Sequence, residues 1–441
     1  MAAEPVPVPT QPRGRLPRWA CQTSLFQLRE PAFWVYVLLL VGTGLLAVGQ
    51  QQSLRAMSPS GWVLSWLLLL LYLVPVFVVV YLLDAYEREP LSLVFGTLLW
   101  GAVAATSLAG LANHDWGAVV ARLLGPDVAA RWTAALTAPL VEETLKALGV
   151  VLIYLIARSE INGVVDGFVY GAMVGLGFAV VENVFYFVGQ FGGQPAGVVA
   201  GFFVRVLASG LYGHVLYTGL TGMGIAWFVT RTDQRLARRL LAAGGLCLLA
   251  VLAHFLWNSP LLNLLPTGEV IPVEQLVAIP LVAAVKGVPF LVVVVLLVAL
   301  ARRQERRWLQ AAAAGELGGP ALLPEELQVL ERPGRRWRVR RALRRRSGRR
   351  AALLKRLHRQ QLSLAMLRTR LSDDDAPDLV SQRQRIAPDP RSPAGGDRWI
   401  SGRGLSQPML SIVRAASHPD PNPVKHGPGQ FVERPSGALG G

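Results

Sequence analysis

Long apolar segments separated by short polar loops dominate the first 300 residues of the chain. A membrane-spanning helix needs about 20 predominantly apolar residues, and roughly eight windows meet this requirement. The pattern therefore predicts an all-α fold, a polytopic transmembrane helix bundle of about eight spans. The windows cover residues 32–50, 61–83, 91–112, 132–157, 163–189, 201–229, 239–259 and 276–300.

The pattern changes after about residue 301, where the chain becomes rich in Ala, Gly, Pro, Arg and Ser. Three parts are predicted: an N-terminal cytoplasmic segment (1–31), a transmembrane domain (32–301) and a basic cytoplasmic C-terminal tail (302–441). Composition predicts that the tail is largely disordered. Residues 351–371 carry a leucine stripe and form either an amphipathic helix on the inner leaflet or a solvated segment with transient helix.

Composition supports a membrane protein, because 52% of the residues are hydrophobic and only 16% are charged. The net charge of +16 is concentrated in the tail, which contains runs of arginine. Anionic lipid headgroups are the expected partner of such a tail. Nucleic acid is disfavoured, because nothing in the tail resembles a folded nucleic-acid-binding module. The two cysteines, Cys21 and Cys247, give no disulfide framework.

The distribution of arginines predicts the orientation, because positively charged loops stay on the cytoplasmic side. One side of the predicted bundle carries most of the loop arginines, and an even number of spans places both termini there. The protein is expected to be a multi-pass protein of the plasma membrane with both termini cytoplasmic. The other side holds only Arg55, Arg122 and Arg131.

Span 132–157 carries charged residues where a span is expected to be apolar. Glu142 and Lys146 are four residues apart and share a helix face, and Glu143 lies about 100° round from Glu142. An ionisable residue at mid-bilayer costs roughly 2.5–3.5 kcal/mol on insertion scales, so such residues usually mark function. Two adjacent carboxylates cannot both ionise cheaply in a medium of low dielectric, so the pKa of one should rise unless a cation or a metal ion compensates. The alternative is a structural Glu–Lys pair that holds two helices together.

Three further spans carry polar side chains: Glu182 in 163–189, His214 in 201–229, and His254 with Asn258 in 239–259. From the helical rise, Glu142 and Glu182 lie about 15 and 10 Å from the outer ends of their spans, and the histidines fit the same level. The four spans are therefore expected to bring carboxylates and imidazoles together in the outer half of the membrane.

Four glycines in span 163–189 predict a face for close helix packing rather than chemistry. Arg205 precedes His214 by nine residues in one predicted helix, which places the two on roughly opposite faces. The glycines are Gly167, Gly171, Gly175 and Gly177.

These residues resemble the PrsW family of intramembrane proteases and the wider superfamily that includes CAAX prenyl proteases and bacteriocin-processing or immunity proteins. The resemblance covers about residues 60–300. It implies hydrolysis of a peptide bond of a membrane-anchored protein, and for PrsW-like proteins the site-1 cleavage of an anti-sigma factor. The matching motifs are Glu142-Glu143-x-x-Lys146, Phe178-x-x-x-Glu182 and His254-x-x-x-Asn258, with His214 on a separate helix.

Two mechanisms follow from the resemblance. In the favoured version, Glu182, His214 and His254 ligate zinc while Glu142 or Glu143 acts as the general base. In the metal-free version, Glu142 or Glu143 activates water directly, and His254 and Asn258 stabilise the oxyanion. The residues given a supporting role are Lys146, Phe178 and Tyr186.

Three alternatives remain at this point. A transporter or channel also carries charged residues at mid-membrane, although no paired inverted repeat is visible here. A membrane scaffold would bury six ionisable groups at a cost on the order of 15 kcal/mol before pairing. An immunity-like or CAAX-type protein with little proteolysis would stay within the same superfamily.

Overall fold

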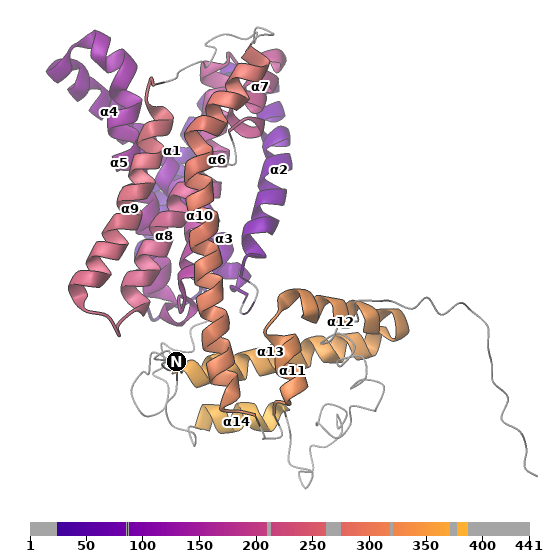
Figure 1. Ribbon diagram of the computed structural model, residues 1–441. Coiled ribbons are helices and arrows are strands. Elements are labelled where there is room, and N and C mark those ends of the chain that lie inside the picture. Colours follow the sequence, from indigo (N-terminus) through magenta and orange to yellow (C-terminus); the bar gives the residue numbers. More distant parts are fainter. Residues whose placement is uncertain are drawn as a thin grey trace, which may run out of the picture. The chain divides into compact units, whose positions relative to one another are not determined.

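A computed structural model describes residues 24–84, 86, 88–209, 213–261, 275–317, 321–370 and 377–386 of the chain. These residues are almost entirely helical and contain no strand (Figure 1). The helices are α1 (Pro31–Met57), α2 (Pro59–Tyr81), α3 (Leu91–Leu99), η2 (Trp100–Ala105), α4 (Thr106–Leu124), α5 (Pro126–Ile156), η3 (Arg158–Glu160), α6 (Val164–Phe185), η4 (Tyr186–Gln190), α7 (Pro195–Phe202), η5 (Phe203–Leu207), α8 (His214–Thr230), α9 (Leu236–Asn258), α10 (Gln275–Ala314), α11 (Pro324–Leu330), α12 (Pro333–Arg346), α13 (Gly348–Arg370) and α14 (Pro377–Ile386).

The described residues divide into two compact units. Helices α1 to α10 belong to the first unit together with residues 362–382, and residues 316–361 and 383–386 belong to the second. Helix α10 runs through the predicted domain boundary at residue 301 and ends at Ala314. The boundary stays a prediction. Helix α13 includes most of the segment 351–371.

Six helical segments among the described residues are long and apolar enough to cross a membrane: Pro31–Met57, Pro59–Tyr81, Leu91–Leu124, Val164–Gln190, Leu236–Asn258 and Val277–Ala314. Helices α5 and α8 pack in the same bundle. Helix α5 interrupts its apolar stretch with Glu142, Glu143 and Lys146, and α8 has only 17 residues. The prediction of an all-α, polytopic bundle is confirmed.

Helix α6 forms the core of the bundle, since 89% of its apolar stretch is buried, against 17% for α1, α2 and α9. The glycine face of α6 explains this close packing. A Cβ at Gly171 would overlap the carbonyl oxygen of Thr218, and a Cβ at Gly175 would overlap that of His214. The interpretation of these glycines as a packing face is therefore confirmed, and the same contacts bring α8 against α6 where the polar residues lie.

One predicted span is wrong. Residues 201–229 do not form a continuous helix: α7 and η5 end at Leu207, and α8 begins at His214 after Gly213 in an extended conformation. The segment between them contains Ser209, Gly210 and Gly213, which have weak helix propensity. His214 is therefore the first residue of a helix rather than a residue in the middle of one.

Candidate active site

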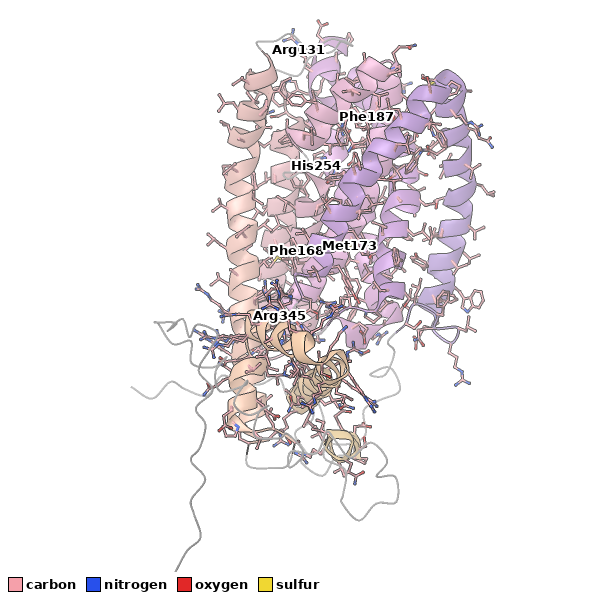
Figure 2. All side chains as sticks on the ribbon, turned by 90° about the vertical axis from the view of Figure 1, so that its right-hand side faces the viewer. Arg131, Phe168, Met173, Phe187, His254 and Arg345 are labelled. Atoms are coloured by element: carbon pink, nitrogen blue, oxygen red, sulfur yellow. The ribbon has the colours of Figure 1, made fainter. Side chains whose placement is uncertain are left out.

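Helices α5, α6, α8 and α9 bring the predicted polar residues together inside the bundle. Figure 2 shows His254 in the half of the bundle nearer to Arg131, which marks the end where α5 begins. The side chains of Glu142, Glu143, Lys146 and His254 are all 4% exposed or less. The residues thus meet at one depth, as the helical rise predicted.

Lys146 is the centre of the cluster. Its ammonium nitrogen Nζ lies 3.2 Å from Glu142 Oε2, 3.0 Å from Glu143 Oε1 and 2.9 Å from His214 Nδ1. It also lies 3.7 Å from the centroid of the Phe178 ring, a favourable position for a cation. The three ammonium protons thus meet three acceptors, which satisfies a cation that is wholly removed from solvent.

Each imidazole has a carboxylate on one of its two nitrogens. His214 Nε2 donates to Glu182 Oε2 at 3.0 Å, and His254 Nδ1 donates to Glu143 Oε1 at 3.1 Å. Because a carboxylate accepts, these contacts assign the proton to those nitrogens. The lone pair of His254 Nε2 then faces Glu142, and the lone pair of His214 Nδ1 accepts from Lys146 beside Glu142. Tyr217 stacks on the His254 ring and supports its orientation.

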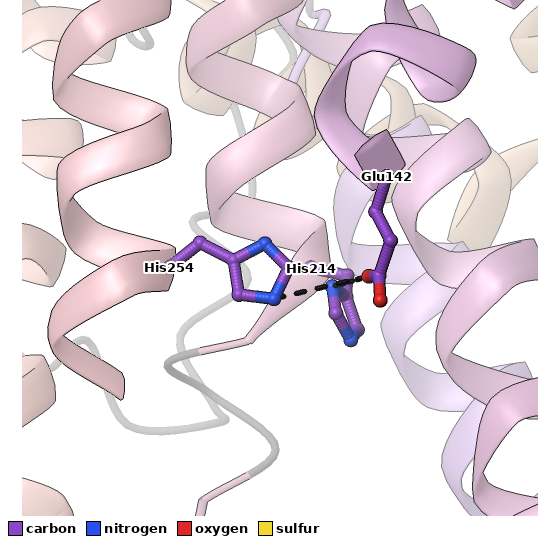
Figure 3. A group of neighbouring side chains, drawn as sticks. All are labelled: Glu142, His214 and His254. Carbon is purple, nitrogen blue, oxygen red and sulfur yellow. Dashed lines mark ion pairs between the residues drawn. The ribbon is translucent and has the colours of Figure 1, made fainter. Parts of the chain in front are cut away.

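Glu142 completes a three-residue set with the two imidazoles (Figure 3). Its Oε2 lies 3.9 Å from His214 Nδ1 and 3.8 Å from His254 Nε2, and the three groups can offer ligand atoms within 4.8 Å of one another. Two imidazoles and one carboxylate fit an open zinc site. The carboxylates behind the imidazoles fit as well, because metal-binding histidines usually donate their other N–H to such a group.

Glu182 occupies a different position from the one predicted for a metal ligand. Its Oε2 accepts from His214 Nε2 and also from Arg205 Nη2 at 2.8 Å. Arg205 in addition donates to Asn183 Oδ1 at 2.6 Å and lies over the Tyr186 ring. The predicted ligand set with Glu182 stays a prediction, but the geometry favours Glu142 in its place.

The sequence pattern did not reveal the role of Arg205. It placed Arg205 and His214 on opposite faces of one helix, whereas the chain breaks between η5 and α8 and lets both side chains reach Glu182. The small residues Ser209, Gly210 and Gly213 between the two helices were the signal in the sequence that could have revealed this break. Thr218 was also missed, and its Oγ1 donates to Glu143 Oε2 at 3.0 Å.

A cavity of about 500 Å³ reaches the cluster between α4, α5, α6 and α9. Glu142 and Glu182 line it together with Phe178, Tyr186 and Asn258. Asn258 Nδ2 donates to the backbone oxygen of Ala134 and so joins α9 to α5, while its predicted part in stabilising an oxyanion stays a prediction.

Asn113 on α4 also lines this cavity and holds Glu142 in place. Its Nδ2 donates to Glu142 Oε1 at 3.1 Å, which leaves Oε2 for Lys146 and the imidazoles. The predicted span ended at residue 112, so Asn113 lay just outside the predicted spans.

The sequence profile of the family described as "PrsW family intramembrane metalloprotease" matches residues 89–285. Over this region the chain is similar to the PrsW family. All the PrsW motif residues named above lie within the matched region, and the predicted family resemblance is confirmed.

A curated relative, "Protease PrsW" from Geobacillus kaustophilus (strain HTA426), is 36% identical over 106 residues. The alignment covers 24% of this chain, and the chain spans 44% of the length of the relative. No solved structure matches the chain.

Proposed function

We propose that the chain is an intramembrane endopeptidase that hydrolyses a peptide bond of a membrane-associated protein. The observation that carries the proposal is the cavity that reaches Glu142, whose Oε2 lies 3.9 Å from a ring nitrogen of His214 and 3.8 Å from one of His254. The PrsW match supports a protease over a transporter or a scaffold. A membrane-anchored anti-sigma factor is the finer substrate proposal, and it rests on the family resemblance alone.

We further propose that Glu142, His214 and His254 hold a divalent metal ion, with zinc as the first candidate. Bound there, the ion would polarise the scissile carbonyl and make water a stronger nucleophile at neutral pH. Glu143 and Glu182 act through the imidazoles by fixing which ring nitrogen carries the proton. Asn113 directs one oxygen of Glu142 towards the imidazoles.

Lys146 has a separate part in this proposal. Its ammonium donates to Glu142, Glu143 and His214, so it neutralises the carboxylates and occupies space beside the proposed ligands. A metal ion brought to the same groups competes with Lys146 for Glu142 and His214. In a metal-free enzyme, Glu142 would take the proton from water and Lys146 would supply the positive charge.

The cavity suggests how a substrate reaches the cluster. Its walls include several small residues, which leave room for an extended peptide backbone beside Glu142. With both termini cytoplasmic, as the arginine distribution predicts, the cavity extends towards the outer side, because Arg131 is among its lining residues. The small residues are Ala109, Gly110, Ala129, Ala130, Ala134 and Ala138.

The test measures metal content and cleavage in the same preparations. We expect near-stoichiometric zinc in the purified wild-type chain and its loss in the His214→Ala, His254→Ala double variant. Cleavage is read from new protein termini among single-span proteins in membranes of the expressing cells. Termini that appear with wild type and not with the double variant support the protease. Their absence with a correctly folded wild type overturns it, whatever the metal content.

A metal-free wild type that still produces new termini would overturn the zinc site and leave the protease standing. In that case Glu142→Gln should abolish the new termini while the chain stays folded. A matched control is Asp115→Asn, the same change of acid to amide at an exposed residue of α4.

A further inference from the structure

The second unit contains a cationic helix face that the proposed protease does not use. Helix α12, Pro333–Arg346, has the sequence PGRRWRVRRALRRR and contains no acidic residue. Eight of its 14 residues are arginines spread all round the helix, so the composition alone does not show which side of the helix is turned outwards. The burial of the side chains shows which side is turned outwards, because it divides the helix into a buried face and an exposed face.

The buried face contains Arg336, Val339 and Leu343, which are 5%, 2% and 3% exposed. At 100° per residue these three positions lie within about 60° of one another. They anchor α12 in its unit and fix which side of the helix is turned outwards.

The outward face lies opposite and gathers one aromatic ring and four guanidinium groups within about 120° of helix surface. Trp337 is 53% exposed, and the Arg341 guanidinium lies 4.9 Å from its ring centroid. The exposed arginines are Arg338, Arg341, Arg344 and Arg345.

We propose that this face of α12 docks on anionic phospholipid headgroups of the membrane in which the bundle sits. Charge complementarity supports a lipid surface, because clustered arginines next to a membrane span bind anionic headgroups. The exposed tryptophan supports it too, since tryptophan prefers the interface between headgroups and hydrocarbon.

The length of the chain before α12 adds to the argument. Helix α10 is a membrane-span candidate that ends at Ala314, and only residues 315–332 separate it from α12. A short tether keeps α12 at a high effective concentration near the surface, so weak headgroup contacts suffice for docking.

The structure thus moves the expected lipid contact from residues 351–371 to α12. The leucine stripe predicted for the membrane lies on α13, where Leu353 is half-buried and Leu357 and Leu364 are buried. Leu371, the last residue of the stripe, lies outside the described residues. A buried stripe cannot cover a bilayer surface, whereas the α12 face is exposed.

The experiment uses the full chain in lipid nanodiscs. A polarity-sensitive fluorophore is attached to Trp337→Cys in a background of Cys21→Ser and Cys247→Ser. We expect a blue shift in nanodiscs rich in phosphatidylglycerol, none in phosphatidylcholine, and reversal by high salt, because salt screens exposed charges.

Charge reversal on α12 identifies the face that carries the docking. Each basic residue near an anionic surface contributes roughly fivefold, so Arg344→Glu with Arg345→Glu should weaken docking at least about 25-fold. Lys355→Glu with Arg359→Glu, two exposed cations of α13, changes the net charge equally and should leave the shift intact. Equal loss in both double variants would overturn the assignment to α12.

Two other outcomes would also overturn the proposal. The first is no shift with any lipid. The second is a shift that requires added RNA and not phosphatidylglycerol, which would make the face a nucleic-acid surface.

Discussion

The bundle interior and helix α12 both concentrate positive charge, but they handle it in opposite ways. Inside the bundle, Lys146 is wholly buried and donates to three acceptors. On α12, four arginines share an exposed face with no acidic residue in the same helix. A buried charge must be paired within the folded protein, whereas an exposed charge is solvated by water and stays available to a binding partner.

This difference indicates what each region is built for. The intramembrane cluster holds three carboxylates, two imidazoles and two cations in fixed mutual contacts, so each member sets the position of the others. The α12 face has no such network and suits a broad surface. Changes in the cluster should therefore have large and specific effects, and changes in the tail small and additive ones.

The largest expected effect separates Glu142 from Glu182. Glu142→Gln should lower the cleavage rate by about 10³-fold and remove the metal, because an amide neither holds a divalent cation well nor takes a proton. Glu182→Gln should keep the metal at saturating zinc while weakening its affinity about 10- to 100-fold, as expected for a group behind a ligand. Metal titration of both variants measures this. The reverse ranking would restore Glu182 as the ligand and remove Glu142.

A smaller effect is expected from Lys146→Met, which keeps the length of the side chain and deletes its charge. Glu142 and Glu143 then lack their shared cation, and breaking a buried ion pair typically costs about 3–5 kcal/mol. Added zinc should recover much of this loss in the variant, because the ion replaces the missing positive charge. Thermal unfolding in detergent with and without zinc measures the recovery. If zinc stabilises wild type and variant equally, Lys146 and the metal do not compete.

The sequence predicted much of this arrangement because its strongest signals are local. Hydropathy marks the spans, and the spacing from Glu142 to Lys146 fixes their shared helix face. The glycine face of α6 predicted where backbones approach closely. Depth within a span follows from the helical rise alone, so the common level of the cluster was also accessible.

The features of the site that the sequence did not predict depend on contacts between segments that are distant in the chain. Apolar residues continue through the break before His214, so hydropathy could not reveal that η5 and α8 are separate helices. Without that break Arg205 could not be assigned to Glu182, and Glu182 remained the obvious carboxylate for a metal. Which of two carboxylates faces two imidazoles is a property of the packed bundle, and no spacing within one helix contains it.

The smallest expected effect is a pH response confined to the tail. Burial, reinforced by the Arg336 and Arg340 guanidinium groups, lowers the pKa of His358 from 6.5 to about 3. As the pH falls, His358 binds a proton in the unfolded tail at a higher pH than in the folded tail. His358 therefore costs no stability above about pH 6.5. The stability of the tail unit should fall as the pH drops below that value, by about 2 kcal/mol at pH 5.

Hydrogen exchange of the full chain measures this response by region. Amides of α13 should lose protection between pH 7 and pH 5, after correction for intrinsic exchange, while those of α6 keep theirs. His358→Gln carries no titrating group and should remove the pH dependence, even though it lowers stability at neutral pH. If the acid response is unchanged in that variant, a group other than His358 titrates. The stability of the tail then does not depend on the protonation of His358.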